Sequence, residues 1–337
     1  MARPERGILW QSFGSPEGPD DVWPFLQNVT RGRGVPEARL RLVADQYLAT
    51  GGSSPLNALN RDLIRRLGDS LGERGVELPI YFGNRNWHPY LADTVDEMAR
   101  DGIQEALVIP SSAYSSYSGC RQYREDLIGC QVTFDTQTLK PFSQHPLFMA
   151  AEASIVASYL ATRPPIDAST TAIFATAHSI PTATADSCDY QRQLGSVCEV
   201  LRALLPSDAP IELAYQSRSG DPRTPWLTPD IADAIHASFE ANPNLRRVIV
   251  IPIGFISDHQ EVLYDLDILA RNAAQSHGLG FDRLPTVGGT SEFIEMLTEL
   301  VLVWNSGGDP NSEIPGAEHL CHDGCCLSGA PPIPTSR

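Results

Sequence analysis

Two short segments carry side chains suited to metal and proton chemistry. His178 lies in Ala177-His178-Ser179-Ile180-Pro181, and Glu261 ends Ser257-Asp258-His259-Gln260-Glu261. A neutral imidazole and a carboxylate suit a borderline divalent metal such as Fe²⁺, and both can accept protons from a weakly acidic N–H. A lone histidine after a strand is more often a polar rim residue, and Asp258-x-x-Glu261 also matches a helix capping box. Because both segments follow predicted strands in the same half of the chain, we interpret them as a functional pair.

A further carboxylate, Asp265, lies four residues after Glu261 and therefore on the same face of a helix. Like charges at this spacing are mildly unfavourable, and a metal or proton pathway would explain them. The alternative is a solvated acidic stripe, which is common in a chain with 41 acidic and 25 basic residues.

Three segments have groups that could bind an anion or a flat aromatic ligand. Arg31 and Arg33 flank a glycine and could hold carboxylates through charge-assisted hydrogen bonds. Residues 51–55, Gly-Gly-Ser-Ser-Pro, offer backbone N–H groups and hydroxyls at a predicted helix N-terminus. Residues 114–123 are rich in hydroxyls and aromatic rings. The alternatives are an exposed loop, ordinary helix capping and an ordinary loop after a strand.

Three of the seven cysteines, Cys321, Cys325 and Cys326, crowd the C-terminal segment. With a fourth ligand from elsewhere they would suit Zn²⁺ or an iron–sulfur cluster, and their spacing does not choose between the two. The alternative is a tail with unligated thiols. In a reducing cytoplasm a disulfide framework is not expected.

Composition excludes several classes of protein. A net charge of -16 argues against a nucleic-acid partner, which requires a basic face. No run approaches the length of a membrane-spanning helix, and the apolar run at residues 7–10 is too short for a signal-peptide core. We therefore expect a cytoplasmic protein. Its 337 residues, 42% hydrophobic and 20% charged, fit two globular domains.

Short apolar runs alternate with helical patterns along the chain. Continuous apolar runs of this kind are typical of parallel strands covered on both faces, and they lie at residues 7–13, 78–82, 106–109, 172–175, 211–214 and 248–253. Helices are expected after Ser54-Pro55, from Leu91 to Gly102, after Thr228-Pro229 and around 293–304. The pattern predicts an α/β protein with two Rossmann-like, doubly wound domains and parallel sheets.

The expected domains are 1–120 and 121–290, with a possible crossover segment at 131–145. The last helix, 291–305, is expected to pack back on the first domain. Residues 306–337 are expected to form an irregular tail that contains cysteines. In such folds ligands bind beyond the carboxyl ends of the strands, where His178 and Glu261 are expected.

An ordered set of motifs resembles the ferrochelatase family, over residues 7 to about 304. The set is Ser12-Phe13-Gly14-Ser15-Pro16-Glu17, Thr30-Arg31-Gly32-Arg33, Gly51-Gly52-Ser53-Ser54-Pro55, Ala177-His178-Ser179-Ile180-Pro181, Trp226-Leu227-x-Pro229 and residues 258–265, DHQEVLYD. Residues 83–87 and 115–123 resemble the actinobacterial branch in particular. The resemblance implies the type II chelatase fold, with a cleft between two similar domains.

The resemblance also implies residue roles. His178 and Glu261 would be catalytic and would bind the Fe²⁺ substrate. Five residues would contact the porphyrin: Phe13, Arg31, Arg33, Ser54 and Tyr123. Where some bacterial relatives have a tyrosine, this chain has Phe13, so a phenolate ligand is absent there. The third acidic position on the helix that carries Glu261 is Leu269, which shortens any acidic relay.

Members of this branch insert iron into coproporphyrin III, and the resemblance implies the same substrate here. The alternatives are insertion into protoporphyrin IX, a cobalt or nickel chelatase of the same fold, and a tetrapyrrole carrier without catalysis. The branch also implies a [2Fe–2S] cluster on Cys120, Cys321, Cys325 and Cys326. A transient contact with the neighbouring haem-pathway enzyme is a further partner that this resemblance suggests.

Overall fold

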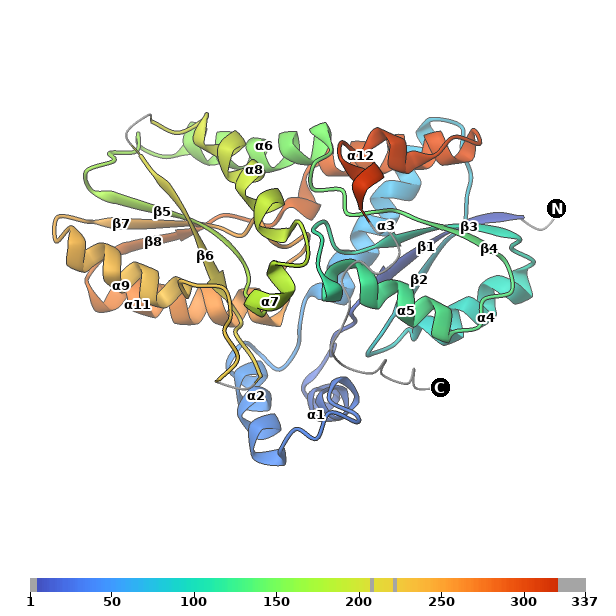
Figure 1. The fold of residues 1–337 in the computed structure, drawn as a ribbon, viewed down its shortest axis with the longest axis horizontal. Helices are drawn as coiled ribbons and strands as arrows, with labels where there is room; N and C mark the ends of the chain where they lie inside the picture. Colours follow the sequence, from blue (N-terminus) through green and yellow to red (C-terminus); the bar gives the residue numbers. More distant parts are fainter. Residues whose placement is uncertain (1–4, 207–208, 221–222, 321–337) are drawn as a thin grey trace. The chain divides into compact units, whose positions relative to one another are not determined.

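The chain forms two units, each built on its own parallel sheet (Figure 1). The computed structural model describes residues 5–206, 209–220 and 223–320. Within this part, the first unit comprises residues 5–113, 117–142 and 294–320, and the second comprises 114–116 and 143–293. The strand orders are β2-β1-β3-β4 and β6-β5-β7-β8, so the two sheets share one topology. The predicted fold class is confirmed.

All strand pairs in both sheets are parallel. The strands of the first sheet are β1 (Arg6–Ser12), β2 (Ile80–Asn84), β3 (Glu105–Pro110) and β4 (Asp135–Thr138). Those of the second are β5 (Thr171–His178), β6 (Ile211–Gln216), β7 (Arg247–Ile251) and β8 (Gly280–Arg283). Six of them lie where apolar runs predicted strands; the edge strands β4 and β8 were not predicted.

Helices connect the strands. Those of the first unit are α1 (Pro19–Val29), α2 (Glu37–Ala49), α3 (Leu56–Glu73), α4 (Leu91–Asp101), the π-helix η1 (Tyr117–Arg121), α5 (Gln122–Gly129), most of α12 (Ser291–Asn305) and the 3₁₀ turns η4 (Pro310–Glu313) and η5 (Ala317–His319). Those of the second are α6 (Pro146–Thr162), α7 (Thr182–Ala185), α8 (Tyr190–Arg202), α9 (Ile231–Ala241), α10 (Gln260–Val262), the π-helix η2 (Leu263–Ala270), α11 (Arg271–Ser276) and the 3₁₀ turn η3 (Val287–Gly289).

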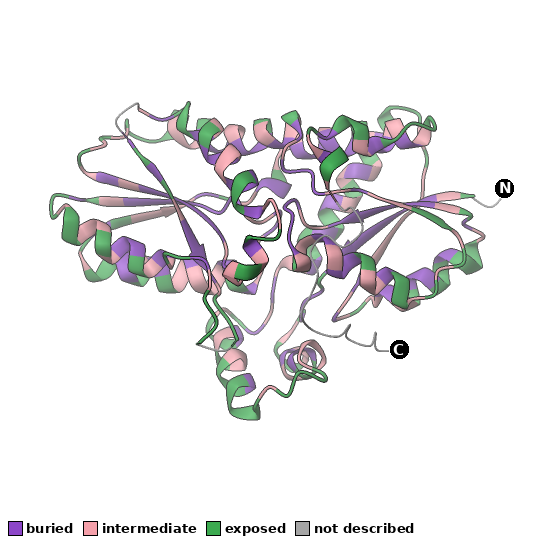
Figure 2. Ribbon diagram, viewed as in Figure 1, coloured by how far each residue is buried: buried purple, intermediate pink, exposed green. Residues whose placement is uncertain are grey.

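Each sheet is buried between helices, which explains why its central strands are apolar on both faces (Figure 2). In the first unit, α4 and α5 pack on β1 and β3. In the second, α9, η2 and α11 pack on β5 and β7. This burial orders the strands, and their carboxyl ends then present the polar residues that follow them.

The boundary between the units differs from the expected one near residue 120. Because β4 pairs with β3, residues 117–142 belong to the first unit. Residues 114–116 belong to the second, where the Tyr114 hydroxyl donates to the Ile253 carbonyl at 2.8 Å. Residues 294–305 of α12 lie in the first unit beside α3, where Thr298 hydrogen-bonds Ser70 at 2.9 Å.

One carboxyl group lies in the core of the second unit. Glu152 on α6 is 2% exposed, and its Oε1 has no hydrogen-bond partner among the described residues. Burial raises the pKa of Glu152 well above its ordinary value. The folded state therefore holds a proton that the unfolded chain releases above a pH of about 4.5.

A Glu152→Gln variant is therefore expected to lose a pH dependence of stability. As the pH rises above the unfolded pKa, the wild-type free energy of unfolding should fall by up to about 1.4 kcal/mol per pH unit relative to the variant. Urea unfolding of both proteins between about pH 5 and 8 measures this difference. Parallel curves across that range would contradict the buried, protonated state.

Candidate functional site

His178 is the last residue of β5, where it pairs with Gln216 at the end of β6. Its carbonyl accepts a hydrogen bond from the Tyr190 hydroxyl at 2.9 Å, and its Nδ1 lies 2.5 Å from the Ser179 carbonyl oxygen. A carbonyl only accepts, so Nδ1 carries the proton of the neutral imidazole. The lone pair therefore lies on Nε2.

The packing beside His178 requires a glycine. Gly254 follows β7, and a Cβ at this position would lie 2.6 Å from the Ala177 Cα. Such a contact would force the end of β5 away from β7. The glycine thus allows the backbone approach that fixes the position of the imidazole.

Glu261 lies in the first turn of α10, opposite that imidazole. Its Oε2 is 3.5 Å from the His178 Nε2, and the two side chains are 51% and 31% exposed. The His259 Nδ1 caps this turn by accepting the Glu261 backbone N–H at 3.2 Å. Asp258 is therefore not the cap, and the capping-box alternative is wrong because Asp258 pairs with Arg283 instead.

The two partners shift each other's ionisation. Burial opposes charge on both, but the charge and hydrogen bond of Glu261, with the Ser179 carbonyl, raise the pKa of His178. Burial also tends to raise the pKa of Glu261, but the charge and hydrogen bond of His178 lower this pKa to about 2. Burial lowers the pKa of His259. The pair therefore exists as imidazolium and carboxylate at acidic pH, and a cation can replace the imidazolium proton.

A second carboxylate continues this site along η2. Burial raises the pKa of Asp265 to about 7, although the Ser217 hydroxyl donates to its Oδ2 and favours the charged form. Ser217 has a positive φ of 63°, an uncommon conformation for a residue with a side chain. The Gln216 side chain donates to the Glu261 carbonyl at 3.3 Å. His178, with its raised pKa, and Asp265, with a pKa of about 7, can thus exchange protons near neutral pH, whereas Glu261 stays ionised.

Arg283, at the end of β8, holds the segments on both sides of Glu261. It contacts Asp258 at 2.9 Å and Asp267 at 2.8 Å, and its side chain is only 13% exposed. These two carboxylates raise the pKa of Arg283 against the effect of burial. Sequence reasoning missed this residue, which lies outside every motif.

Replacing Arg283 with glutamine is expected to lower the free energy of unfolding by on the order of 2–3 kcal/mol, because two partly buried carboxylates lose their partner. The matched control is Arg271→Gln, whose guanidinium lies 3.6 Å from the same Asp267 but is 40% exposed. That variant should lose less than about 1 kcal/mol. Urea unfolding of the three proteins measures both values, and equal losses would contradict the argument.

The residues predicted to contact a porphyrin all lie in the first unit. Arg31 and Arg33 are exposed in the turn after α1, and Phe13, which follows β1, is 38% exposed. Ser54 and Tyr123 are buried. The Ser54 hydroxyl accepts the Leu56 N–H at 3.4 Å, as expected of a residue before a helix.

Arg85 also lies in this region, and it was not among the site residues predicted from the sequence. It forms an ion pair with Asp126, and its guanidinium lies 4.6 Å from the Tyr123 ring centroid and 5.7 Å from that of Phe13. Partial desolvation by neighbouring groups and the charge of Arg85 lower the pKa of Arg33. The group is therefore electropositive and aromatic, and the position of Arg85 just after β2 was the available signal.

Of the predicted cluster ligands, the structure describes one. Cys120 is buried in η1, whereas Cys321, Cys325 and Cys326 lie outside the described residues. Within residues 5–206, 209–220 and 223–320, no group of three or more His, Cys, Asp or Glu side chains forms a metal site. In this part of the chain, His178 and Glu261 form a pair rather than a closed site.

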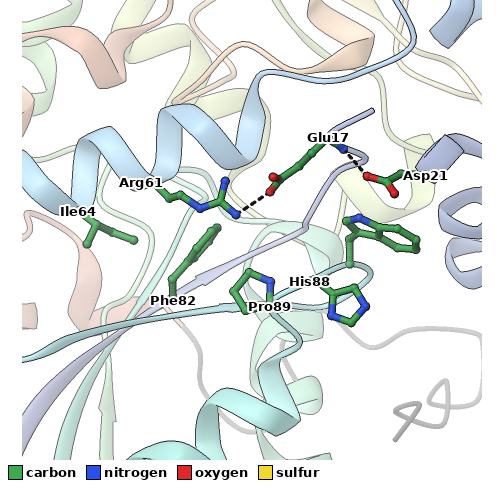
Figure 3. Close-up of a pocket in the computed structure, with 8 residues that line it drawn as sticks. Glu17, Asp21, Arg61, Ile64, Phe82, His88 and Pro89 are labelled. Carbon is green, nitrogen blue, oxygen red and sulfur yellow. Dashed lines mark hydrogen bonds and ion pairs between the residues drawn. The ribbon is translucent and has the colours of Figure 1, made fainter. Parts of the chain in front are cut away.

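A separate open pocket of about 740 Å³ lies in the first unit (Figure 3). Its lining includes Trp87, His88 and the ion pair between Glu17 and Arg61, whose atoms are 2.6 Å apart. None of the predicted site residues lines it. We therefore do not assign the candidate chemistry to this pocket.

In the described part of the chain, no helix combines the length and apolar character needed to cross a bilayer.

Two solved structures share the fold of this chain. The chain resembles the structure of SirB from Bacillus subtilis with Fe³⁺ (TM-score 0.53, 10% identity, covering 94% of this chain and 98% of that one). It also resembles CbiX, described as the terminal enzyme of sirohaem biosynthesis in denitrifying bacteria (TM-score 0.51, 15% identity, 88% and 99%). At these identities the likeness supports the fold alone.

Sequence relatives are much closer. The chain is 43% identical to a coproporphyrin III ferrochelatase of Nocardia farcinica, covering 98% of this chain and 99% of the relative. It is 41% identical to the proteins of the same name from Streptomyces coelicolor (98% and 95%) and Mycolicibacterium smegmatis (97% and 97%). The family model for ferrochelatase matches residues 5–303. On this evidence the chain belongs to the ferrochelatase family.

Proposed function

We propose that this chain inserts Fe²⁺ into coproporphyrin III to give iron coproporphyrin in haem biosynthesis. The observation that carries the proposal is the 3.5 Å contact between His178 Nε2 and Glu261 Oε2 in a chain of this family. The names of the actinobacterial relatives support the choice of porphyrin. The reaction exchanges one Fe²⁺ for two pyrrole N–H protons, so it needs groups that bind a cation and groups that accept protons.

His178 and Glu261 are proposed as the catalytic pair and as the ligands of the incoming iron. Once the imidazolium of His178 has lost its proton, its Nε2 offers the lone pair that a metal or a pyrrole proton requires. Asp265, with a pKa of about 7, is partly ionised at neutral pH and is proposed to accept protons from this pair.

The porphyrin carboxylates are proposed to bind the first unit. Coproporphyrin III has four propionates, and Arg31 and Arg33 are exposed cations in a chain of net charge -16. Ser54, Tyr123 and Phe13 are proposed to complete the contact surface. An arginine–carboxylate bond of this kind is charge-assisted and directional.

An Arg33→Ala variant is expected to raise the KM for coproporphyrin III by about 10-fold, as the loss of one charge-assisted hydrogen bond predicts. Its kcat should change less, because Arg33 would contact the substrate away from the reacting nitrogens. Arg39→Ala, which removes another exposed arginine, serves as the control. A KM equal to that of wild type would remove Arg33 from the proposed surface.

The overall function is tested by an anaerobic insertion assay with both porphyrins. We expect Fe²⁺ insertion into coproporphyrin III with a kcat/KM well above that for protoporphyrin IX. A preference for protoporphyrin IX would replace the proposed substrate, and faster insertion of Co²⁺ or Ni²⁺ would replace the metal. Binding of porphyrin without metallation would indicate a tetrapyrrole carrier and overturn the catalytic proposal.

We also propose that Cys120 and the three cysteines near the C-terminus hold a [2Fe–2S] cluster. The support is the set of four thiols, of which Cys120 is buried in the π-helix η1. A red-brown protein with two irons and acid-labile sulfide per chain is expected. A colourless protein with one Zn²⁺, or one without metal, would overturn this assignment.

A cytoplasmic location is proposed as well, because a reducing compartment keeps cysteines as thiols, the form that can ligate a metal. A transient contact with the enzyme that receives the product is proposed on the resemblance alone. Co-purification from cell extract with and without added porphyrin tests that contact.

A further inference from the structure

Two histidines outside the candidate site face each other in the second unit. His236 lies on α9, and His277 is the residue directly after α11. The His236 Nδ1 and the His277 Nε2 are 2.7 Å apart. Among the described residues, no hydrogen bond or ion pair joins either ring to His178 or Glu261.

The short distance has a chemical consequence. A hydrogen bond between two neutral imidazoles requires one nitrogen to carry a proton and the other a lone pair. Exchange with water can move the shared proton to the other nitrogen of the same ring. Both facing nitrogens, His236 Nδ1 and His277 Nε2, then carry a lone pair. Two nitrogen ligands of a tetrahedral Zn²⁺, each at about 2.05 Å, lie roughly 3.3 Å apart. The two nitrogens must therefore separate by about 0.6 Å, and each ring must turn so that its lone pair points at the ion instead of at the other nitrogen.

The surroundings hold the two rings in place. Phe239, one turn after His236 on α9, stacks on the His277 ring with centroids 4.2 Å apart and planes 24° apart. Ile235 of α9 and Ala274 of α11 are both fully buried in one core cluster. The two backbones are therefore fixed, while the imidazoles themselves are only half-buried and open to a solvated ion.

The set of ligands determines the class of ion. Within the described residues, no third His, Cys, Asp or Glu completes a closed site here, so water must supply the remaining ligands. Two imidazoles favour Zn²⁺, Ni²⁺ or Cu²⁺, whereas Mg²⁺ and Ca²⁺ require oxygen ligands.

We propose that His236 and His277 form a two-imidazole site for a divalent transition-metal ion, which links α9 to α11. This site is separate from the proposed site of iron insertion and does not depend on that function. Because the ion binds the folded arrangement, it should stabilise the protein by mass action.

The test measures Zn²⁺ bound by the full chain in equilibrium dialysis. His236→Asn and His277→Asn should each bind one ion fewer than wild type, and the control His88→Asn, which removes an exposed histidine of the first unit, should bind as many as wild type. Comparing proteins that differ by one histidine cancels binding at His178 and at the cysteines.

A second measurement uses the native chain with ¹⁵N-labelled histidine. Zn²⁺ should shift the ring signals of His236 and His277, and Mg²⁺ should leave them unchanged. This experiment decides the matter even where a variant does not fold. Unchanged stoichiometry in both folded variants, or ring signals of this pair that do not respond to Zn²⁺, would overturn the proposal.

Discussion

Replacing His178 with alanine is expected to reduce the kcat of iron insertion by on the order of 10²–10⁴, the usual contribution of a positioned proton acceptor. The variant removes the Nε2 that faces Glu261 at 3.5 Å and leaves that carboxylate without its cationic partner. Because the His178 side chain is 31% exposed, the core should stay intact. Anaerobic single-turnover measurements with Fe²⁺ and coproporphyrin III give the rate.

The control for this experiment is His88→Ala, which removes an exposed histidine in the first unit. Its rate should equal that of wild type. Circular dichroism and urea unfolding of both variants verify that a loss of rate is not a loss of fold. A folded His178→Ala protein with wild-type turnover would exclude the proposed role of the imidazole.

The second large effect is expected from Glu261→Gln, which should lower both the rate of insertion and the pKa of His178. Burial disfavours the imidazolium, and the charge and hydrogen bond of Glu261, together with the Ser179 carbonyl and the charge of Asp265, outweigh it. Without the carboxylate, burial dominates and the pKa of His178 falls. The neutral imidazole then persists to lower pH, so the acidic limb of the residual activity should move to lower pH.

Stability should respond to the same change. The raised pKa of His178 contributes stability that is present at low pH and is lost as the pH rises through its folded value. The lowered pKa of Glu261 contributes stability that is lost as the pH falls toward about 2. In wild type the pair therefore stabilises the fold between these limits, and this window should be absent from the glutamine variant.

Asp265→Asn provides a graded comparison, since Asp265 also raises the pKa of His178 but by a smaller effect. NMR titration of the histidine ring should place this variant between wild type and Glu261→Gln. Identical titration curves for all three proteins would show that the carboxylates do not control the imidazole.

The buried strands could be predicted from the sequence, and the edge strands could not. Runs such as residues 248–253 are apolar because helices cover both faces of the sheet. By contrast, β4 reads Asp-Thr-Gln-Thr and lies at an edge with much of its surface exposed, so it lacks the apolar pattern. This omission also moved the expected end of the first unit to residue 120.

The positions of the candidate site residues could be predicted in part, and their roles stay a proposal. His178 and Glu261 were recognisable because each follows an apolar strand, and the structure brings them together. The interpretation of Asp258 as a helix cap failed because its partner, Arg283, lies 25 positions later in the sequence. The ion pair of Arg85 with Asp126 was likewise not predictable, although the position of Arg85 just after β2 was a local signal. Local patterns do not contain such long-range partners.

The two sheets have the same strand order, so the same scaffold occurs twice in the chain and differs in the residues of its loops. Beyond β5 and β7 the loops carry an imidazole and a carboxylate, whereas beyond β1 and β2 they carry an aromatic ring and a guanidinium. Such loops can diverge while the strands that support them keep the same layout. The same strand layout can therefore support a carboxylate in the loops of one unit and a guanidinium in the loops of the other.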